Sequence, residues 1–520
     1  MSASTASWEP MALQPEDAGR QTDSKQPLAQ PSPTLPRGST GQGRMAALLS
    51  CFGLMADIYD FGIINLVRPI LAKEFGNMTP AQDSMITGAA VLGAMVGQIA
   101  FGSVADFCGR RVLFISSAAL VGVASLGSAC AGFLPGFGLN VYMILAIWRF
   151  LMGVGIGGEY PLAAASTAEN VDVKSSGQAL ATVFAGMALG GILAPCVVIM
   201  LAGPLGLNAD LTWRLAFGFG GVLALLVASL RCYYLQETEG WRQATGSLTS
   251  SSHSPSEAQE PQADTSGGFA ETATALMSMQ RALAGTVVSW FLYDIVTYGV
   301  GLFTTTIFPA EPGLAAARTV LFINLITLPG FAGAVFVAPR FQLRQVQFLG
   351  LMAMCACFAL LVALYDVLSH TGYLFLTIFS LQRCFDVMGP GMATFSIPGQ
   401  IYPTKVRGTA HGLSAAAGKL GAVIGTVIFP SLNTLAGLRT VYTFMATMCL
   451  AAAIWTLVFV PPYDHITLEK IVALESSSMP LPQQASAAHA LLFDGTNETD
   501  ADRKGYMLTG YGAALFTTTK

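Results

Sequence analysis

An apolar stretch near the middle of the chain carries two aromatic side chains and one carboxylate at one-turn intervals. Trp290, Asp294 and Tyr298 stand at positions i, i+4 and i+8, so a helix would place them on one face. The indole N–H and the phenol O–H can donate to anionic oxygens, and the carboxylate can accept from a substrate hydroxyl. We therefore predict a site for a partly protonated oxyanion, with Asp294 as a proton carrier. The alternative is an aromatic belt with one buried acid.

Charged residues in three other apolar stretches are further candidates, because charges inside membrane helices are costly and usually functional. Asp57 and Asp60 share a helix face and are expected either to relay protons or to pair with a basic residue elsewhere. Glu159 is a further candidate for proton coupling, and Arg149 is expected to have a gating or structural role. Lys419 is expected either to contact the substrate or to act as a structural counter-charge.

Another basic residue, Arg383, lies one helical turn before Asp386 in an apolar stretch. The two side chains either neutralise each other or leave Arg383 to bind the substrate anion, for which its planar guanidinium is suited. The sequence shows no nucleophile–base constellation and no metal-ligand spacing. We therefore expect neither an enzyme, nor a metal site, nor a cofactor.

Membrane-spanning helices must position these residues. Of the 520 residues, 53% are hydrophobic and only 11% are charged, against about 25% charged in soluble proteins. No basic run is dense enough to predict nucleic-acid binding. Apolar runs of about 20 residues, the length that crosses a bilayer core, recur along the chain. We place twelve spans near 45–67, 84–105, 112–132, 140–163, 177–201, 212–231, 283–307, 317–338, 346–364, 373–399, 409–431 and 440–460.

Polar segments divide the chain into five parts and separate the spans into two sets of six. The middle of the central segment reads SLTSSSHSPSEAQEPQADTSGG, a composition that buries too little apolar surface to fold. The expected parts are a disordered tail (1–44), a six-helix bundle (45–231), a disordered linker (232–281), a second six-helix bundle (282–462) and a polar tail (463–520).

Basic residues in the short loops are concentrated on the side that carries both termini and the central linker. Because cytosolic loops are enriched in Lys and Arg, both tails and the linker are expected to be cytosolic. Asn77 would then face outward and could be glycosylated. We expect a multi-pass protein of the plasma membrane with a monomeric transport unit.

The loop between the second and third spans reads Gly102-Ser-Val-Ala-Asp106-Phe-Cys-Gly109-Arg110-Arg111. The glycines allow a tight turn, Asp106 can pair locally, and the arginines can anchor the loop at the inner leaflet. The spacing resembles the loop signature of the major facilitator superfamily. That resemblance implies an all-α fold of twelve transmembrane helices in two six-helix halves, with a site between them.

The fourth span reads Arg149-Phe-Leu-Met-Gly153-Val-Gly155-Ile-Gly157-Gly158-Glu159-Tyr160-Pro161-Leu162. It resembles the signature of the phosphate:proton symporters, in which an acidic residue precedes Tyr-Pro-Leu. Segments 57–67, 290–299 and 402–419 extend this resemblance over both halves. The resemblance favours phosphate as substrate and protons as the coupled ion. Tyr160 joins Trp290, Asp294, Tyr298, Lys419 and Arg383 as candidates for substrate binding.

Three positions depart from the symporter pattern. Gly186-Met187 stands where an Asn-Gln pair is usual, Gly391 where Asn is usual, and Gln400 where Glu is usual. The segment 303–307 looks like that of the related glycerophosphodiester transporters. His411, next to the loop between spans ten and eleven, is expected to be a loop or cap residue.

The function that we predict is proton-coupled import of inorganic phosphate by alternating access. One alternative is import of an organic phosphate or another small organic anion, because small side chains at 186 and 391 would enlarge the pocket. A second alternative, from another class, is a nutrient-sensing receptor.

Overall fold

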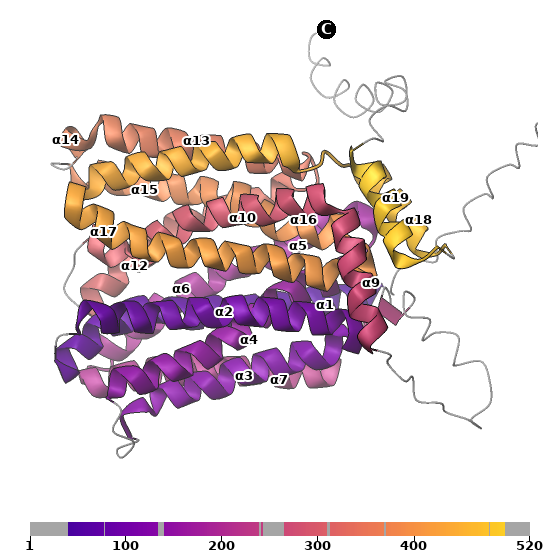
Figure 1. Cartoon of the computed structure of the whole chain (residues 1–520). Coiled ribbons are helices and arrows are strands. Elements are labelled where there is room, and N and C mark those ends of the chain that lie inside the picture. The colour runs from indigo at the N-terminus through magenta and orange to yellow at the C-terminus, as the bar shows by residue number, and fades with distance from the viewer. Residues whose placement is uncertain are drawn as a thin grey trace, which may run out of the picture. The chain divides into compact units, whose positions relative to one another are not determined.

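The computed structural model describes residues 40–76, 78–133, 140–238, 241–242, 265–308, 313–368, 371–477 and 479–493. These described residues form helices joined by short turns, and no strand occurs among them (Figure 1). Asn77, the expected glycosylation site, lies outside the described residues.

In the described chain, the first half of the bundle comprises eight helical elements, three of which start at capping side chains. The eight elements are α1 (Thr40–Phe75), α2 (Pro80–Cys108), α3 (Arg110–Ala129), the short η1 (Ala131–Phe133), α4 (Val141–Glu169), α5 (Val173–Ala185), α6 (Met187–Ala202) and α7 (Ala209–Tyr234). Thr79 and Gln82 form a reciprocal capping box at the start of α2. Asn140 and Asn208 accept from backbone N–H groups at the starts of α4 and α7. These caps satisfy donors that a helix start leaves unpaired.

The second half is also built of helices, which are interrupted more often. Its elements are α10 (Gln280–Gly301), α11 (Thr304–Ile307), α12 (Leu314–Val337), α13 (Leu343–Ala363), α14 (Tyr365–Leu368), α15 (Gly372–Asp386), the π-helical turn η3 (Val387–Gly391), α16 (Met392–Ile401) and α17 (Thr404–Phe459). Helix α10 lies along α17, as α2 lies along α4 in the first half (Figure 1).

The expected twelve spans are confirmed. Ten helices of the described chain are long and apolar enough to cross a membrane, with α5 and α6 forming one of them across Gly186. One of the ten, α17, supplies two spans because Gly437, with a φ of 77°, breaks the helix. The run of α15, η3 and α16 supplies the twelfth.

Close packing of α2 against α4 explains the glycines of the fourth span. A Cβ atom at Gly153 would overlap the backbone carbonyl of Ala90, and one at Gly157 would overlap that of Ala94. Small residues let membrane helices approach to backbone contact in this way. These glycines therefore serve packing.

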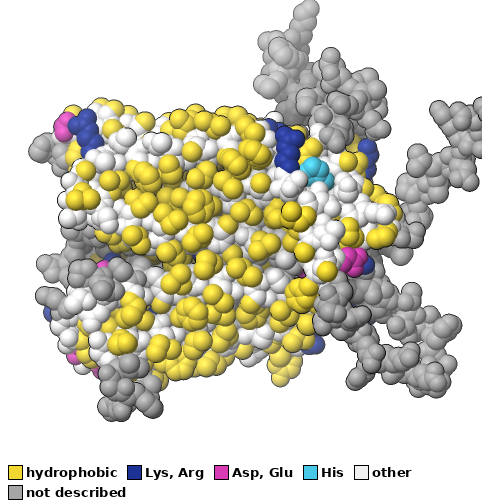
Figure 2. Space-filling model, in the orientation of Figure 1, with side chains coloured by type: hydrophobic (Ala, Val, Ile, Leu, Met, Phe, Trp, Pro, Cys, Tyr) yellow, Lys and Arg dark blue, Asp and Glu magenta, His cyan; other side chains and the backbone are white. Residues whose placement is uncertain are grey.

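The outer surface matches a lipid environment. Figure 2 shows a face of the bundle covered by hydrophobic side chains, with Lys and Arg gathered towards its two ends. Exposed apolar residues such as Val112, Leu226 and Leu349 belong to the outer faces of α3, α7 and α13. Such a wide apolar surface is stable only against lipid.

Three helices outside the spans correct the expected organisation. Helices α9 (Thr265–Ser278), α18 (His465–Glu475) and α19 (Leu481–Phe493) lie together at one end of the bundle (Figure 1). The expectation of disorder is therefore wrong for 265–278. Residues 465–475 and 481–493 of the expected polar tail also form helices. The physical reason is an apolar face on each helix, which buries residues such as Ala275, Leu276, Ile471 and Leu492.

Candidate functional site

A cavity of about 260 Å³ lies between the two halves. Helices α1, α4, α5 and α6 of the first half line it, together with α10, α12, α15, η3, α16 and α17 of the second. Four charged residues line this cavity, Asp294, Arg383, Asp386 and Lys419, and all four belong to the second half. The charge chemistry of the site thus comes from one half of the molecule.

Lys419 of α17 joins two of the residues predicted on α10. Its Nζ lies 2.9 Å from Oδ2 of Asp294 and donates to the hydroxyl of Tyr298 at 2.8 Å. Both charged side chains are almost fully buried. The same ammonium lies 5.5 Å from the ring centre of Tyr160, which approaches from α4 of the first half. The structure therefore brings Asp294, Tyr298, Lys419 and Tyr160 together at one point of the cavity.

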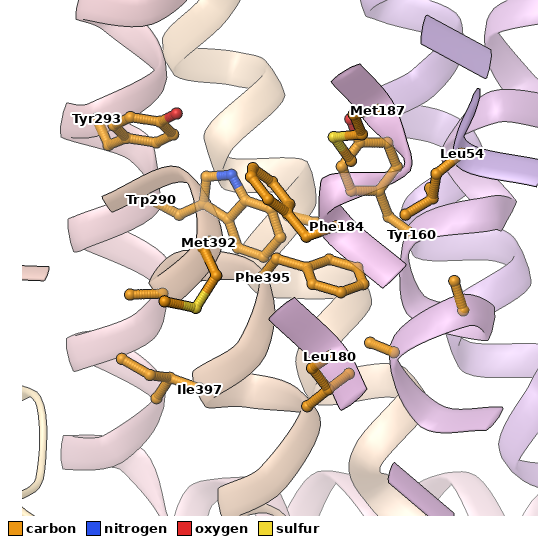
Figure 3. Close-up of a cluster of buried hydrophobic side chains, with 14 of the residues drawn as sticks. Leu54, Tyr160, Leu180, Phe184, Met187, Trp290, Tyr293, Met392, Phe395 and Ile397 are labelled. Carbon is orange, nitrogen blue, oxygen red and sulfur yellow. The ribbon is translucent and has the colours of Figure 1, made fainter. Parts of the chain in front are cut away.

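Aromatic side chains form an apolar wall beside this cluster. Figure 3 shows Trp290, Phe184 and Phe395 grouped between the ribbons of the two halves. The ring of Trp290 also meets that of His411 edge-on, with ring centres 5.4 Å apart. His411 is fully buried inside α17, and its Nε2 lies 3.0 Å from the carbonyl oxygen of Phe395. The expectation that His411 is a loop or cap residue is therefore wrong, because α17 begins seven residues earlier, at Thr404.

Arg383 and Asp386 form an ion pair on the cavity wall. Asp386 also accepts hydrogen bonds from the hydroxyls of Tyr293, at 2.5 Å, and Thr297, at 3.1 Å. Both donors are on α10, next to the predicted Asp294. The pairing that we considered is therefore present, and Arg383 lines the cavity as well.

Glu159 of the first half is held in a buried ion pair away from the cavity lining. Its two carboxylate oxygens accept from Arg231 at 2.6 and 2.7 Å, and Ser117 donates at 2.7 Å. The Arg231 guanidinium lies over the ring of Phe114, 3.6 Å from its centre. Arg231, at the end of the sixth expected span, is fully buried.

Asp57 and Asp60 face different basic residues. Asp57 interacts electrostatically with Glu159 and Arg231, and its Oδ2 has no hydrogen-bond partner in the described chain. Both carboxylate oxygens of Asp60 are buried and lack such a partner among the described residues. Arg149 instead donates to the backbone carbonyl oxygen of Asp60 at 2.7 Å. None of these five acids and bases of the first half lines the cavity.

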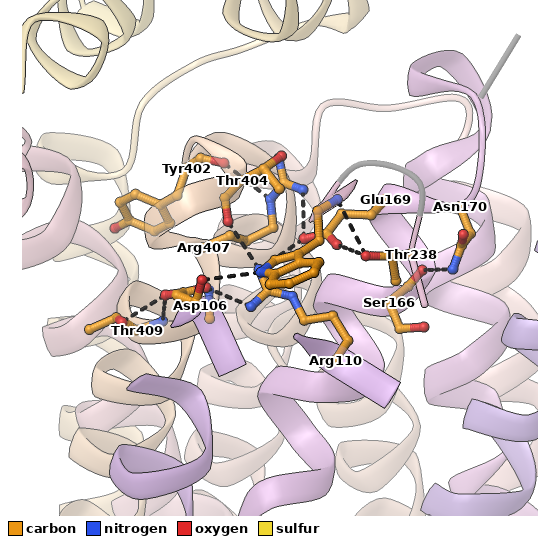
Figure 4. Close-up of polar contacts among 12 residues, drawn as sticks. Asp106, Arg110, Ser166, Glu169, Asn170, Thr238, Tyr402, Thr404, Arg407 and Thr409 are labelled. Atoms are coloured by element: carbon orange, nitrogen blue, oxygen red, sulfur yellow. Dashed lines mark hydrogen bonds and ion pairs between the residues drawn. The ribbon is translucent and has the colours of Figure 1, made fainter. Parts of the chain in front are cut away.

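A polar network closes one end of the bundle and joins the two halves (Figure 4). Asp106 of α2 accepts from the backbone N–H groups of Gly408 and Thr409 in α17, at 3.0 and 2.7 Å. Arg110 of α3 pairs with Asp106 at 2.8 Å and with Glu169 of α4 at 3.1 Å. We call this end, which also carries α9, α18 and α19, the network end.

The rest of the predicted loop motif supports this network. Gly109 takes a φ of 90°, which lets α2 turn into α3. Arg111 donates from Nε to the carbonyl oxygen of Leu235 at 2.7 Å. Gly102 approaches the backbone of Gly408, where a Cβ atom would lie 2.6 Å from the carbonyl oxygen. The motif thus works as contacts within and between the halves.

Two further carboxylates and one arginine of the network end were not among the predicted site residues. Arg407 lies 3.4 Å from Glu169 and 3.6 Å from Glu475 of α18. Glu475 also accepts from the backbone N–H of Thr404 at 2.7 Å, at the start of α17. Arg407 belongs to the segment 402–419 that carries the resemblance, but no sequence pattern indicates that Glu475 reaches it.

The three departures from the symporter pattern have different places. Met187 and Gly391 line the cavity. Gln400 lies outside the lining and connects Ser176, at 2.6 Å, with Tyr463, at 2.8 Å. Burial raises the pKa of Tyr463, so its hydroxyl remains a donor to Gln400. No group of acidic, His or Cys side chains within the described ranges could hold a metal ion.

Two six-helix halves around a cavity lined by buried charges define a transporter of the major facilitator fold. Comparison with solved structures agrees. The major facilitator proton:xylose symporter XylE aligns with a TM-score of 0.65 and 20% sequence identity, over 82% of this chain and 97% of its own. The human organic anion transporter MFSD10 aligns with a TM-score of 0.55, over 80% and 99%. At this identity the likeness concerns the fold.

The chain belongs to the sugar (and other) transporter family, whose sequence profile matches residues 46–474. Its relatives include inorganic phosphate transporter PT2 of Toxoplasma gondii, 29% identical over 82% of this chain and 74% of that protein. The repressible high-affinity phosphate permease of Neurospora crassa is 28% identical, over 75% and 78%. Inorganic phosphate transporter PHO84 of Saccharomyces cerevisiae is 27% identical, over 72% and 73%.

Proposed function

We propose that the protein imports inorganic phosphate together with protons, by alternating access of the central cavity. The observation that carries the proposal is the ion pair of Lys419 and Asp294, which lines the cavity beside the hydroxyl of Tyr298. A cation, a carboxylate and phenol hydroxyls are the groups that a partly protonated phosphate needs. The names of the phosphate-transporting relatives support the same substrate.

Phosphate binds, in this proposal, between Lys419, Tyr160, Tyr298 and Trp290. Lys419 is shared between Asp294 and the anion. When phosphate takes the ammonium, the carboxylate of Asp294 loses its counter-charge in a buried place and accepts a proton. This exchange couples the proton to the substrate.

Asp57, Asp60 and Glu159 are proposed as proton-coupling residues of the first half. The unpartnered oxygens of Asp57 and Asp60 support this role, because a buried carboxylate without donors is costly unless it binds a proton. Glu159 would have to leave Arg231 before it could act. Arg149 is proposed to support Asp60 through its backbone carbonyl.

Alternating access requires a closure that can open. The network of Asp106, Arg110, Glu169 and Arg407 supports this role, since it links α2, α3 and α4 to α17. We propose that the network end is cytosolic, with both termini on that side, and that the protein acts as a monomer in the plasma membrane. The cavity then faces away from the cytosol while this network is intact.

Uptake of labelled phosphate into vesicles reconstituted with the full chain tests the proposal. A proton gradient directed into the vesicles should drive accumulation of phosphate, and a protonophore should abolish this accumulation. Arsenate, glycerol phosphate and a sugar serve as competitors. Phosphate uptake that no pH gradient drives would refute the coupling, and stronger competition by the phosphate ester would favour an organic phosphate as substrate. Phosphate binding without uptake would favour a receptor.

A further inference from the structure

The ion pair of Arg383 and Asp386 is unevenly exposed. Asp386 is fully buried, whereas 24% of the Arg383 side chain is exposed, and both residues line the cavity. An anion that enters the cavity therefore meets the guanidinium before the carboxylate. A pair with only a structural role does not need its cation to face the substrate space.

The hydrogen bonds of the two partners differ in the same sense. Asp386 receives three donors, from Tyr293, Thr297 and Arg383. Arg383 makes one hydrogen bond within the described part of the chain, to Asp386, although a guanidinium has five N–H groups. Both carboxylate oxygens of Asp386 thus have donors, while Arg383 keeps N–H groups for a ligand with planar or tetrahedral oxygens.

The charges in the cavity balance before the substrate enters. Asp294 and Asp386 carry one negative charge each, and Lys419 and Arg383 carry one positive charge each. A phosphate dianion, HPO4²⁻, adds two negative charges to this buried space, where uncompensated charge is strongly unfavourable. Two protons, one on each carboxylate that gives up its cation, restore the balance.

We propose that Arg383 and Asp386 form a second coupling pair, in which the substrate anion takes over the guanidinium and Asp386 carries a proton while the anion is bound. The inference rests on the proposed function and adds a second proton acceptor to the cavity. No covalent bond changes: one proton moves from the medium to Asp386 on binding and leaves with the anion on release. Tyr293 and Thr297 stay in place and orient the carboxyl group.

Few other ionisable groups interact with Asp386. On α10 they are Tyr293, Asp294 and Tyr298, and on α17 Cys449 interacts with it electrostatically. Helices α12 and α13, which lie against α15, contribute the thiols Cys355 and Cys357 and have no other ionisable side chain except arginines near their ends. Within the described residues, Arg383 is the cation that forms an ion pair with Asp386.

The backbone next to the pair can accommodate a change of partner. Asp386 is the last residue of α15, and the π-helical turn η3 follows at Val387–Gly391. Single π-helical turns inside membrane or soluble helices are often found at functional sites. A Cβ atom at Gly391 would lie 2.8 Å from the Tyr293 hydroxyl, so glycine at this position lets that hydroxyl reach Asp386.

The test measures protons and phosphate together in reconstituted vesicles, with the membrane potential held at zero. Asp386→Asn keeps the shape and an acceptor for Tyr293 but cannot carry a proton. We expect phosphate transport to persist with one proton fewer per phosphate. The limiting accumulation ratio should then fall tenfold for each pH unit of gradient. The matched control is Asp366→Asn, since Asp366 is an exposed acid 3.6 Å from Arg439.

Each outcome decides between the readings. Unchanged proton stoichiometry in Asp386→Asn overturns the second coupling pair while leaving phosphate transport intact, whereas absence of phosphate transport in the unmodified chain rejects the proposed function instead. If Asp386→Asn does not fold, the double variant Arg383→Gln with Asp386→Asn removes both charges and strands neither. That variant should transport with weaker apparent affinity and one proton fewer, and full stoichiometry in it would show a purely structural pair.

Discussion

The first half buries more charged residues than the second, yet only charged residues of the second half line the cavity. In the second half, Asp294, Lys419, Arg383 and Asp386 all line the cavity. In the first half, Glu159 and Arg231 are sealed in a bidentate pair, and Asp60 has no hydrogen-bond partner within the described residues. Intramembrane charge alone therefore does not identify a substrate site. Charged residues that line the cavity can contact the substrate. The other buried charges stabilise the bundle or act only in another conformation.

The largest effect is expected at Asp294, the carboxylate that shares Lys419 with the cavity. Asp294→Asn keeps the size of the side chain but removes its ability to take a proton. We expect pH-driven accumulation of phosphate to fall to what the proton on Asp386 alone can drive, while exchange of internal for external phosphate continues, because exchange needs no net proton movement. The measurement is labelled phosphate uptake with and without a pH gradient, with Asp366→Asn as control. Full accumulation by Asp294→Asn would place the coupling elsewhere.

At Glu159, we expect substitution to lower the stability of the protein rather than to act directly on transport. Glu159→Gln leaves the buried guanidinium of Arg231 without its bidentate partner. The free energy of unfolding should fall by about 3–5 kcal/mol. Thermal unfolding of the purified protein in detergent measures this change.

The double variant Glu159→Gln with Arg231→Met is the control for this pair. It removes both charges and should recover most of the stability. If it also accumulates phosphate as the unmodified protein does, Glu159 has no part in proton coupling.

A smaller effect is expected at Tyr298, whose hydroxyl accepts a hydrogen bond from Lys419. Tyr298→Phe removes one neutral hydroxyl beside the charged pair, which costs about 0.5–1.5 kcal/mol. The apparent affinity for phosphate should fall by about 2- to 10-fold. Tyr442→Phe is the matched control, since the Tyr442 hydroxyl is buried outside the cavity lining and has no hydrogen-bond partner in the described chain. Equal effects of both substitutions would argue against a substrate contact of Tyr298.

The smallest effect on stability is expected at Asp60. Asp60→Asn replaces a buried carboxylate without a hydrogen-bond donor in the described chain with a neutral amide of the same shape, but it also removes the negative charge that faces the buried Arg149. These two effects oppose each other, so the free energy of unfolding should change by no more than about 1 kcal/mol in either direction. Asp172→Asn changes an exposed acid whose side chain makes no capping hydrogen bond and serves as the control. A clear loss of stability would mean that Arg149 depends on the carboxylate itself.

The sequence was sufficient for the fold and for part of the site. Apolar runs set by the bilayer thickness gave the spans, and one-turn spacing placed Trp290, Asp294 and Tyr298 on one helix face. The pairing of Lys419 with Asp294, across two helices, follows from the packing of α10 on α17. Spacing along one helix carries no information about such a contact.

The parts that were missed depend on contacts far apart in the chain. Tyr293 stands next to the predicted Asp294, but its hydrogen bond to Asp386 joins residues 93 positions apart. The helices α9, α18 and α19 were missed because their apolar faces are short and lie in polar surroundings. Local composition indicated disorder for 265–278 and a polar tail for 465–475 and 481–493. The packing of these helices against one another stabilises them instead.

Glu475 has a practical consequence for anyone who shortens or tags the chain. It stands beyond the last span, yet its carboxylate caps the start of α17 through the N–H and hydroxyl of Thr404 and faces Arg407. A fluorescent fusion attached after Phe493 leaves that contact untouched. Trimming at residue 464, the natural choice if the spans alone are kept, removes an acceptor from inside the closure between the halves. A C-terminal boundary chosen from hydropathy alone would therefore remove a contact of the network end.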